Sequence, residues 1–356
     1  MELVILDDSF NETAIIDTYE SLIWTERYFK CGDFELYIPF KSNILECIKH
    51  NYYAFMKDST QQMIVEGIEV KTDPETGSHI TFSGRSLESM LDRRIIWDKT
   101  ILSGNFQNGI KKLLDENVIN PSNANRKIPN FIFKKSTDPV ITALKIDAQY
   151  TGDNLYTVIQ NQCETNGVGF QIILNDNNEF EFSLYNGADR SFSQEANPYV
   201  IFSKNFNNID NSNYIKSVQP MKNVTLVAGE EPIANDWSSR RKVTVGTATG
   251  MNRRELFTDA RDLQSTDSNG NKISDADYIS QLNQRGVEKL LENKYDETFD
   301  GEIEAKQEFI YGKDFFKGDI VQIENELGID AKARVSEYIR SQDSDGLSQY
   351  PTFSII

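Results

Sequence analysis

The sequence predicts a β-dominated α+β fold, with antiparallel strands towards both ends of the chain and helices between them. Short runs of strand-forming residues alternate with turn residues through residues 1–83, and such runs return from residue 215 onward. Helical spacing of apolar residues is confined to residues 84–194 and to a long segment that begins at Asp275. At 356 residues, the chain suits two or three domains.

The N-terminal region, residues 1–83, is expected to form an antiparallel barrel or sandwich. Turn residues such as Asp7-Asp8 and Gly32-Asp33 separate its strand-like runs. None of the intervening segments is long enough for the helical crossover that parallel strands require. The predicted strands are residues 3–6, 22–29, 34–40, 52–57, 63–70 and 79–82.

Residues 84–194 are expected to form a mixed α/β insertion with three helices. Ser86 can cap the first helix, Asp153 begins the third, and Gly167 is placed to end it. A hairpin with its turn at residues 175–178 follows. The apolar faces of the three helices are Leu87, Met90 and Leu91; Phe106, Ile110, Leu113 and Leu114; and Leu155, Val158, Ile159 and Cys163.

The C-terminal region again predicts strands, which are antiparallel in character. A long helix interrupts it, running from Asp275 to about Tyr295 with one apolar face. The predicted strands are residues 215–218, 223–228, 301–309, 319–324, 333–340 and 352–356.

A short internal sequence similarity, an echo of one region in the other, links the two strand-rich regions. Residues 53–57 followed by 63–70 resemble residues 320–324 followed by 333–340, and both pairs are expected to be hairpins of similar spacing. Two like barrels in one chain would leave such an echo behind.

The charge balance argues against a protein that binds nucleic acid. The formal net charge is −18, whereas phosphate binding requires clustered lysine and arginine. An acidic balance serves solubility, and an acidic lumen would also let DNA slide past without sticking.

The cysteines and the chain start indicate a protein made in a reducing cytoplasm. Cys31, Cys47 and Cys163 are odd in number and widely spaced, which excludes a disulfide framework. The first ten residues lack the basic start and apolar core of a signal peptide. No apolar run approaches the roughly 20 residues of a membrane-spanning helix.

The sequence carries no recognisable catalytic or cofactor motif, so we expect a protein that is not an enzyme and has no cofactor. His50 and His79 have no metal-ligand spacing with Cys, Asp or Glu. Around Ser86, the nucleophile-elbow pattern fails because Glu88 stands where the second glycine belongs. No phosphate-binding loop occurs.

An incomplete calcium-loop pattern lies just before the long helix. Its oxygen-bearing side chains are Asp267, Asn269, Asn271 and Asp275. Lys272 replaces the glycine of position six, and Tyr278 replaces the bidentate glutamate of position twelve. A solvated turn that leads into the helix cap explains the same residues.

A basic patch stands out in this acidic chain, and it consists of Arg240, Arg241, Arg253, Arg254 and Arg261. Two interpretations remain open. The arginines either pair within the chain with acids such as Glu255, Asp259 and Asp262, or form salt bridges to another subunit.

Three stretches, residues 82–96, 250–263 and 309–323, resemble the siphophage tail-hub family, the baseplate hub or tail-associated structural proteins. The resemblance spans most of the chain, and its most specific element is Tyr-Gly-x-Asp-Phe-x-x-Gly-Asp-x-Val. Its signature residues are Tyr311, Gly312, Asp314, Gly318 and Asp319. Here the glycines allow tight turns and the aspartates can bind turn amides, so the motif indicates a structural role.

The resemblance implies a hub similar to the baseplate hub of contractile phages, with two antiparallel β-barrel hub domains. The first would be residues 1–83, completed by part of 195–215, and residues 84–194 the insertion. The second would be residues 195–356, with a helical insertion at about 253–297.

The implied assembly is a homotrimer with pseudo-sixfold symmetry that matches the hexameric tail-tube rings. It would cap the tube at the virion tail tip after assembly in the bacterial host cytoplasm. Its neighbours would be the distal tail ring, the tape-measure protein and a tip or receptor-binding protein. It would open for DNA ejection, with DNA crossing the lumen unbound.

Two alternatives remain. A receptor- or carbohydrate-binding tip module would expose clustered aromatic residues, but Trp24, Trp97 and Trp237 lie far apart in sequence. A hub associated with a cell-wall hydrolase would carry a catalytic set, which the sequence does not show.

Overall fold

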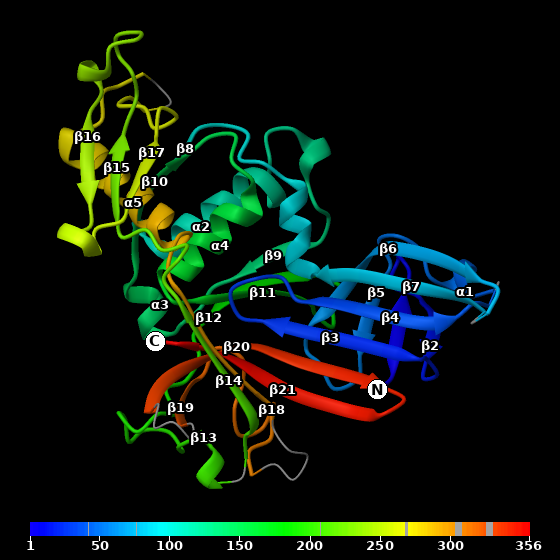
Figure 1. Cartoon of the computed structure of the whole chain (residues 1–356). Coiled ribbons are helices and arrows are strands. Elements are labelled where there is room, and N and C mark those ends of the chain that lie inside the picture. Colours follow the sequence, from blue (N-terminus) through cyan, green and yellow to red (C-terminus); the bar gives the residue numbers. More distant parts are fainter. Residues whose placement is uncertain (42, 76, 207, 268–269, 303–307, 325–329) are drawn as a thin grey trace. The chain divides into compact units, whose positions relative to one another are not determined.

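The computed structural model of the chain describes residues 1–41, 43–75, 77–206, 208–267, 270–302, 308–324 and 330–356. Two compact units emerge (Figure 1). The first unit is Met1–Ser89, Gly169–Tyr214 and Thr298–Ile356, and the second unit is Met90–Val168 and Ile215–Glu297. The expected three-part division at residues 83 and 194 stays a prediction. The hairpin that was expected within the insertion belongs to the first of the two compact units.

The first unit is built mainly from strands, because alternating apolar side chains let each strand bury one face. Two of its strands, β14 and β18, continue across the boundary into the second unit. Its elements are β1 Leu3–Leu6, β2 Glu12–Ile16, β3 Ser21–Arg27, β4 Asp33–Pro39, α1 Ile44–Cys47, β5 Tyr53–Met56, β6 Gln62–Asp73, β7 Gly77–Ser86, β11 Gly169–Leu174, β12 Phe180–Tyr185, β13 Ile201–Ser203, η4 Lys204–Phe206, β14 Asp210–Ser217, β18 Asp296–Glu302, β19 Ile320–Glu324, β20 Asp330–Asp343 and β21 Gly346–Ile355.

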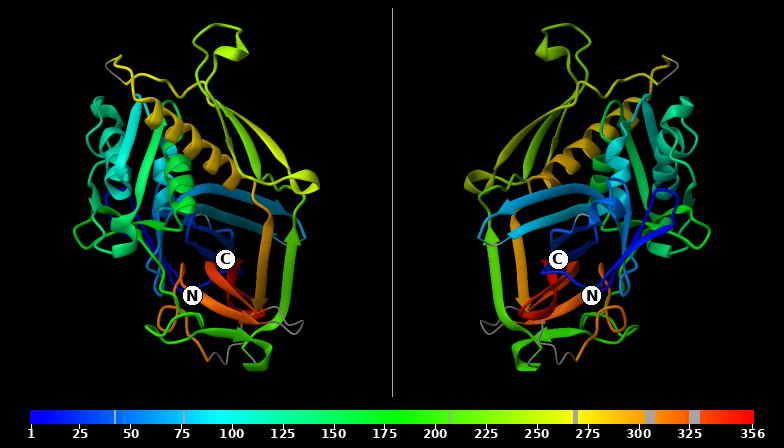
Figure 2. Two further views of the ribbon diagram at one scale, coloured as in Figure 1. Left: turned by 90° about the vertical axis from the view of Figure 1, so that its left-hand side faces the viewer. Right: turned by 90° about the vertical axis from the view of Figure 1, so that its right-hand side faces the viewer.

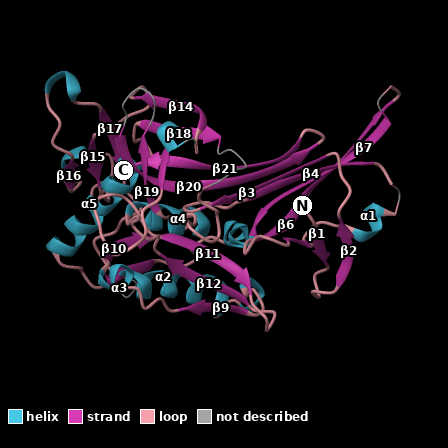
Figure 3. Cartoon of the chain, turned by 90° about the horizontal axis from the view of Figure 1, so that it is seen from below, coloured by secondary structure: helices cyan, strands magenta, loops and turns pink. Residues whose placement is uncertain are grey.

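A 13-stranded sheet runs through this unit (Figure 3). Its order is β14-β18-β21-β20-β3-β4-β7-β6-β5-β1-β2, with β19 on β20 and β13 on β19. Pairing is mostly antiparallel, as expected, but β13 runs parallel to β19. The described strands close no barrel, so the two-barrel expectation stays a prediction.

The sheet contains the same strand order twice. The order β3-β4-β7-β6-β5-β1 corresponds to β14-β18-β21-β20-β19-β13. Equivalent strands of the two sets also follow one another in the same order along the chain. The two long strands also carry a bulge at matching places, between Val65 and Gly67 in β6 and between Val335 and Glu337 in β20. One pairing differs, because β1 is antiparallel to β5 whereas β13 is parallel to β19.

Each copy of this order has its own apolar core. Trp24, Phe34 and Phe82 are buried in the N-terminal core. Phe202 and Phe353 are buried in a separate C-terminal core. A fully buried aromatic side chain contributes about 1.5–3 kcal/mol relative to an exposed one, so each half has its own source of stability.

The second unit combines helices with two small sets of strands, β8 with β10 and β15 with β16 and β17, together with strand β9 (Figure 2). In one set β15 is antiparallel to β16 but parallel to β17, a strand that lies within the expected helical insertion. Helix α5 packs on these strands through Leu282 and Tyr278. The elements are β8 Thr100–Asn105, α2 Phe106–Leu114, η2 Asp115–Ile119, η3 Ala124–Arg126, β9 Phe131–Lys134, α3 Pro139–Ala143, β10 Lys145–Tyr150, α4 Leu155–Thr165, β15 Val224–Ala228, η5 Trp237–Ser239, β16 Lys242–Val245, η6 Gly250–Asn252, β17 Glu255–Asp259 and α5 Asp275–Leu291.

The predicted helices lie where periodicity placed them, with corrected ends. Helix α4 is capped by Asn154 rather than begun by Asp153, and α5 ends at Leu291 rather than near Tyr295. The helix predicted after Ser86 is a 3-10 helix, η1 Leu87–Arg93. No helix among the described residues has the length and apolar character needed to cross a bilayer.

Several strands were missed, and the strand predicted at residues 301–309 falls largely outside the described residues, with only its start in β18. The structure places β18 at Asp296–Glu302, and residues 303–307 lie outside the described part of the chain. The missed strands are β2, β8, β9, β10, β13, β16 and β17.

Candidate functional site

The signature element forms the turn that leads into β19. Gly312 and Gly318 have φ values of +84° and +92°, a region that favours glycine. The carboxylate of Asp314 accepts a hydrogen bond of 2.8 Å from the backbone amide of Ile310. The glycines therefore allow the backbone conformation of the turn, and the aspartate stabilises it by a hydrogen bond.

Asp319 ties this turn to a neighbouring segment of the first unit. Its carboxylate accepts hydrogen bonds from the Ala188 amide at 2.7 Å, from Arg190 Nε at 2.7 Å and from the Phe316 amide at 3.1 Å. The residue is buried, and a buried carboxylate requires such partners. Asp319 thus fixes the position at which β19 enters the sheet.

Gly318 is also constrained by space. A Cβ atom at this position would lie 2.2 Å from the Tyr28 ring. The same ring also makes a cation–π contact with the guanidinium of Arg334, which lies 5.0 Å from the centroid of Tyr28. Both backbone conformation and packing therefore require glycine here.

Tyr311 reaches a buried ionic cluster, the Glu26 cluster, which consists of Glu26, Ser59, Tyr311, Lys317 and Arg340. Glu26 lies on β3 and is 2% exposed. Its carboxylate accepts hydrogen bonds from Arg340 Nη1 at 2.7 Å, Ser59 Oγ at 2.7 Å and Tyr311 Oη at 3.0 Å. Lys317 Nζ lies 4.0 Å away. The cluster joins β3 and β20, strands from the two copies of the repeated order.

The electrostatics keep Glu26 ionised. Burial raises its pKa, but the charges of Lys317 and Arg340, together with its hydrogen bonds, outweigh burial and hold the pKa below the ordinary value. Burial and the adjacent carboxylate raise the pKa of the Tyr311 hydroxyl well above its usual range, so this group stays a hydrogen-bond donor.

Stacked aromatic rings cover the cluster. Tyr311 and Tyr338 lie parallel with ring centroids 3.7 Å apart. The guanidinium of Arg340 lies 5.4 Å from the Tyr311 centroid and 5.0 Å from that of Tyr338. Cation–π contacts in a buried site contribute about 2 kcal/mol. The Glu26 cluster therefore fixes β3 relative to β20, because its hydrogen bonds and ring contacts restrain one another.

A second buried network lies within the second unit. Glu288 on α5 accepts hydrogen bonds from Tyr150 Oη at 2.9 Å and Gln162 Nε2 at 2.5 Å. Burial raises its pKa, and the nearby charge of Arg285 offsets only part of that effect. Arg285 itself bonds to Asp262 at 2.9 Å. The network fixes α5 against β10 and α4.

The five arginines of the predicted basic patch lie in the second unit, and four pair within the chain. Arg240 is buried and bonds to Asp259 at 2.6 Å and to the carbonyls of Gly229 and Ala228. The other three pairs are Arg241 with Asp275, Arg253 with Glu255 and Arg261 with Asp259. For Arg254, the structure gives a backbone contact, from its amide to Asn223. The contact to another subunit stays a prediction.

The predicted calcium-loop residues serve a turn and an ion pair. Asp267 accepts hydrogen bonds from the Asn271 amide at 2.8 Å and from its side chain at 3.0 Å. Asp275 bonds to Arg241 at 2.7 Å. Asn269 lies outside the described residues. In the part of the chain that the structure describes, no group of three or more His, Cys, Asp or Glu is arranged to hold a metal.

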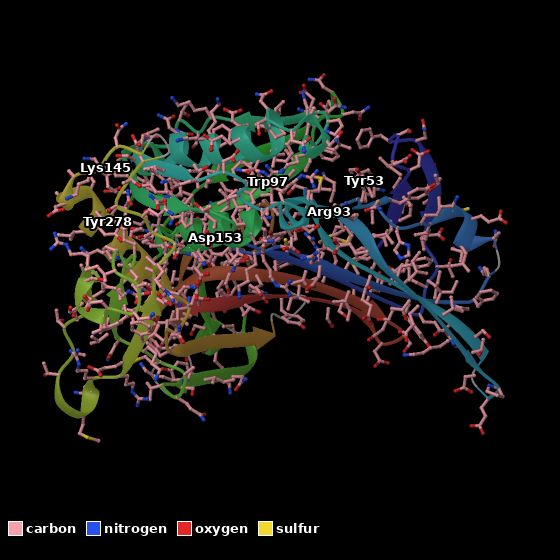
Figure 4. All side chains as sticks on the ribbon, turned by 90° about the horizontal axis from the view of Figure 1, so that it is seen from above. Tyr53, Arg93, Trp97, Lys145, Asp153 and Tyr278 are labelled. Atoms are coloured by element: carbon pink, nitrogen blue, oxygen red, sulfur yellow. The ribbon has the colours of Figure 1, made fainter. Side chains whose placement is uncertain are left out.

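The remaining reactive residue types are also engaged in packing. Nε2 of His79 lies 3.2 Å from Glu20, and its ring stacks on Tyr37. Cys163 lies on the buried face of α4, where burial raises the pKa of its thiol. Tyr278, labelled in Figure 4, donates to the Leu263 carbonyl at 2.7 Å.

Sequence reasoning did not single out Glu26, Ser59 or Arg340. A signal for Glu26 existed in the alternation of β3, since Leu22, Trp24 and Glu26 share one face of the strand. A charge on an otherwise apolar face indicates a buried, paired group. Nothing local could have identified Arg340 as its partner.

A comparison with protein families matches residues 2–353 to the model described as "Siphovirus ReqiPepy6 Gp37-like protein". The search of curated proteins gave no match.

Solved structures show the same fold at low identity. A 43 kDa tail protein of prophage MuSo2 from Shewanella oneidensis matches with a TM-score of 0.58 and 13% identity, covering 99% of this chain and 98% of that one. A tail protein from Neisseria meningitidis gives 0.56 and 13%, covering 99% and 95%. The prophage tail protein gp18 from Listeria monocytogenes gives 0.54 and 14%, covering 99% and 94%.

Proposed function

The chain belongs to the siphovirus ReqiPepy6 Gp37-like family of phage tail proteins, and from this premise we propose that three copies form a ring at the tail tip. The ring would join the distal tail ring to the tip or receptor-binding apparatus. It would close the tube until DNA is ejected, and it would act by assembly and opening, with no covalent bond made or broken.

The repeated strand order is the observation that carries this proposal. A trimer that meets a hexameric tube faces a symmetry mismatch. Each chain has two similar strand sets, one made of β1 and β3 to β7 and the other of β13, β14 and β18 to β21. These two sets offer six near-equivalent contacts from three subunits. The two β-barrel hub domains would then be completed in the assembled ring.

The Glu26 cluster supports the same proposal. It holds the two strand sets in one orientation by joining β3 to β20 through buried, charge-assisted bonds. A rigid relation between the sets is what a pseudo-sixfold ring requires. The net charge of −18 fits a lumen that DNA crosses without binding.

The carbohydrate-binding alternative finds less support. Trp24 is buried, whereas Trp97 and Trp237 are exposed and contact different neighbours, Arg126 and Phe257 respectively. In the described part of the chain, these rings do not form the shared aromatic surface that a sugar site would use.

Sedimentation analysis of the purified chain at increasing concentration tests the proposal. The expected result is a species of three times the 40.7 kDa chain mass. A monomer at every concentration would contradict the ring.

A further inference from the structure

We propose that β14 of one copy pairs with the outer half of β6 in the next copy, so that one sheet continues from subunit to subunit. The proposal rests on the ring described above and names the surface through which it forms. It concerns Gly67 to Thr72 of β6 and the terminal strand β14.

Strand β20 shows what such a contact looks like within one chain. One edge of β20 is shared by two partners. Its first half, from Asp330 to Arg334, pairs with β19, and its second half, from Glu337 to Gln342, pairs with β3. The bulge after Val335 separates the two halves.

Strand β6 has the same layout with one partner missing among the described strands. Its first half, from Gln62 to Ile64, pairs with β5. Beyond the bulge, the second half has registered partners only on β7, along its other edge. The position that β3 takes on β20 therefore has no occupant on β6 in the described part of this chain.

The exposure of matched residues points the same way. Because the two bulges align Gly67 with Glu337, Val70 corresponds to Arg340. Arg340, which pairs with Trp24 of β3, is 6% exposed, whereas Val70 is 45% exposed. An apolar side chain half exposed on a strand edge is a site where another strand can add.

Strand β14 is the matching donor. It corresponds to β3 in the repeated order, but it ends the sheet, with β18 as its only neighbour in the described strand order. Ile215 on β14 is 47% exposed. Strand β3 pairs with β20, the long strand of the other set. By the same relation, β14 would pair with β6, the long strand of the first set.

The occupant must be a second copy of this chain. Within one chain, six strands separate β14 from β6 in the sheet order, and the described strands show no pairing between these two. A contact of one surface with a different surface of the next subunit is heterologous, and it closes as a ring when the rotation permits. Three such contacts would complete the trimer.

The charges on β6 offer the competing explanation. Glu69 and Lys71 are exposed and lie 3.4 Å apart, and charges on an edge strand can simply keep it solvated. Under that explanation, β6 remains exposed in the assembled protein.

Disulfide trapping in the full chain separates the two explanations. Cysteine replaces Val70 or Lys71 on β6 and, in the same chain, Asn213 or Ile215 on β14, giving four pairings that cover the alternative registers. The background carries Cys47→Ser, because Cys31 and Cys163 are buried. At least one pairing is expected to yield a covalent trimer on oxidation, while the single-cysteine variants yield dimers at most.

A matched pair of substitutions provides the second measurement. Val70→Asp is expected to weaken assembly at least tenfold in sedimentation, with unchanged circular dichroism. Val287→Asp, on the 41% exposed Val287 of α5, should leave assembly unchanged. A wild-type trimer that none of the four pairings traps, and that Val70→Asp leaves intact, overturns this pairing but not the ring. A wild-type monomer overturns the ring itself and the pairing with it.

Discussion

Arg340 Nη1 donates a 2.7 Å hydrogen bond to the carboxylate of Glu26 across a separation of 314 residues. Both side chains are almost wholly buried, on strands that belong to different copies of the repeated order. Breaking a buried pair by removing one partner is far costlier than losing an exposed pair, because the other charge stays buried. This bond is therefore a point at which the relation between the two strand sets can be tested.

Glu26→Gln is expected to lower the free energy of unfolding by about 3 kcal/mol near neutral pH, because Arg340 and Lys317 lose their buried counter-charge. Urea denaturation measures the change. Glu69→Gln, an exposed glutamate, should change it by less than about 0.5 kcal/mol. Equal effects of the two variants would show that the cluster does not stabilise the fold.

The pH dependence of this loss has a definite sign. The folded-state pKa of Glu26 is lowered, so its contribution is present above the ordinary glutamate pKa and disappears as the pH falls through the folded-state value. The stability difference between wild type and Glu26→Gln should therefore shrink at acidic pH. A difference that grows on acidification would contradict the assignment.

Glu288 should behave in the opposite way. Burial raises its pKa, so the folded state favours the protonated form, and stability from this group is lost as the pH rises through the raised value. Glu288→Gln is expected to cost less than about 1 kcal/mol near neutral pH, since glutamine can still accept from Tyr150 and Arg285 keeps its bond to Asp262. Denaturation of both variants across the acidic range checks the contrast with Glu26.

Gly318→Ala is expected to destabilise the chain by about 2–4 kcal/mol, because the new methyl group meets the Tyr28 ring at a positive φ. Gly312→Ala is the control, since φ is also positive there but no atom lies within 4 Å of the position that the alanine methyl group would take. It should cost about 1 kcal/mol. Thermal unfolding compares the two, and equal losses would show that the Tyr28 contact is unimportant.

Much of the fold followed from local pattern. The helical stripe of Phe106 to Leu114 and the alternation of Leu3 to Leu6 gave α2 and β1 directly, since each element buries the face that its own sequence defines. Strand β16 alternates as well, but at four residues its alternation is too short to distinguish a strand from a loop, and it was missed. The parallel pairing of β15 with β17 is set by tertiary contacts and has no local signal.

The candidate site divides in the same way. The turn chemistry of Gly312 and Asp314 could be anticipated, because each residue acts on its own neighbours. The partners of Glu26 could not, because Arg340 is brought to it only by the pairing of β3 with β20. The short echo between residues 53–70 and 320–340 pointed to equivalent hairpins, and the matching strand order and bulges extend that echo.

A reconstruction of the assembled protein by electron cryo-microscopy is the sharpest test of the ring. We expect a threefold ring whose inner region repeats six times, with β14 of each chain beside β6 of the next. A ring in which the two strand sets of each chain make unrelated contacts, or an assembly without threefold symmetry, would contradict it.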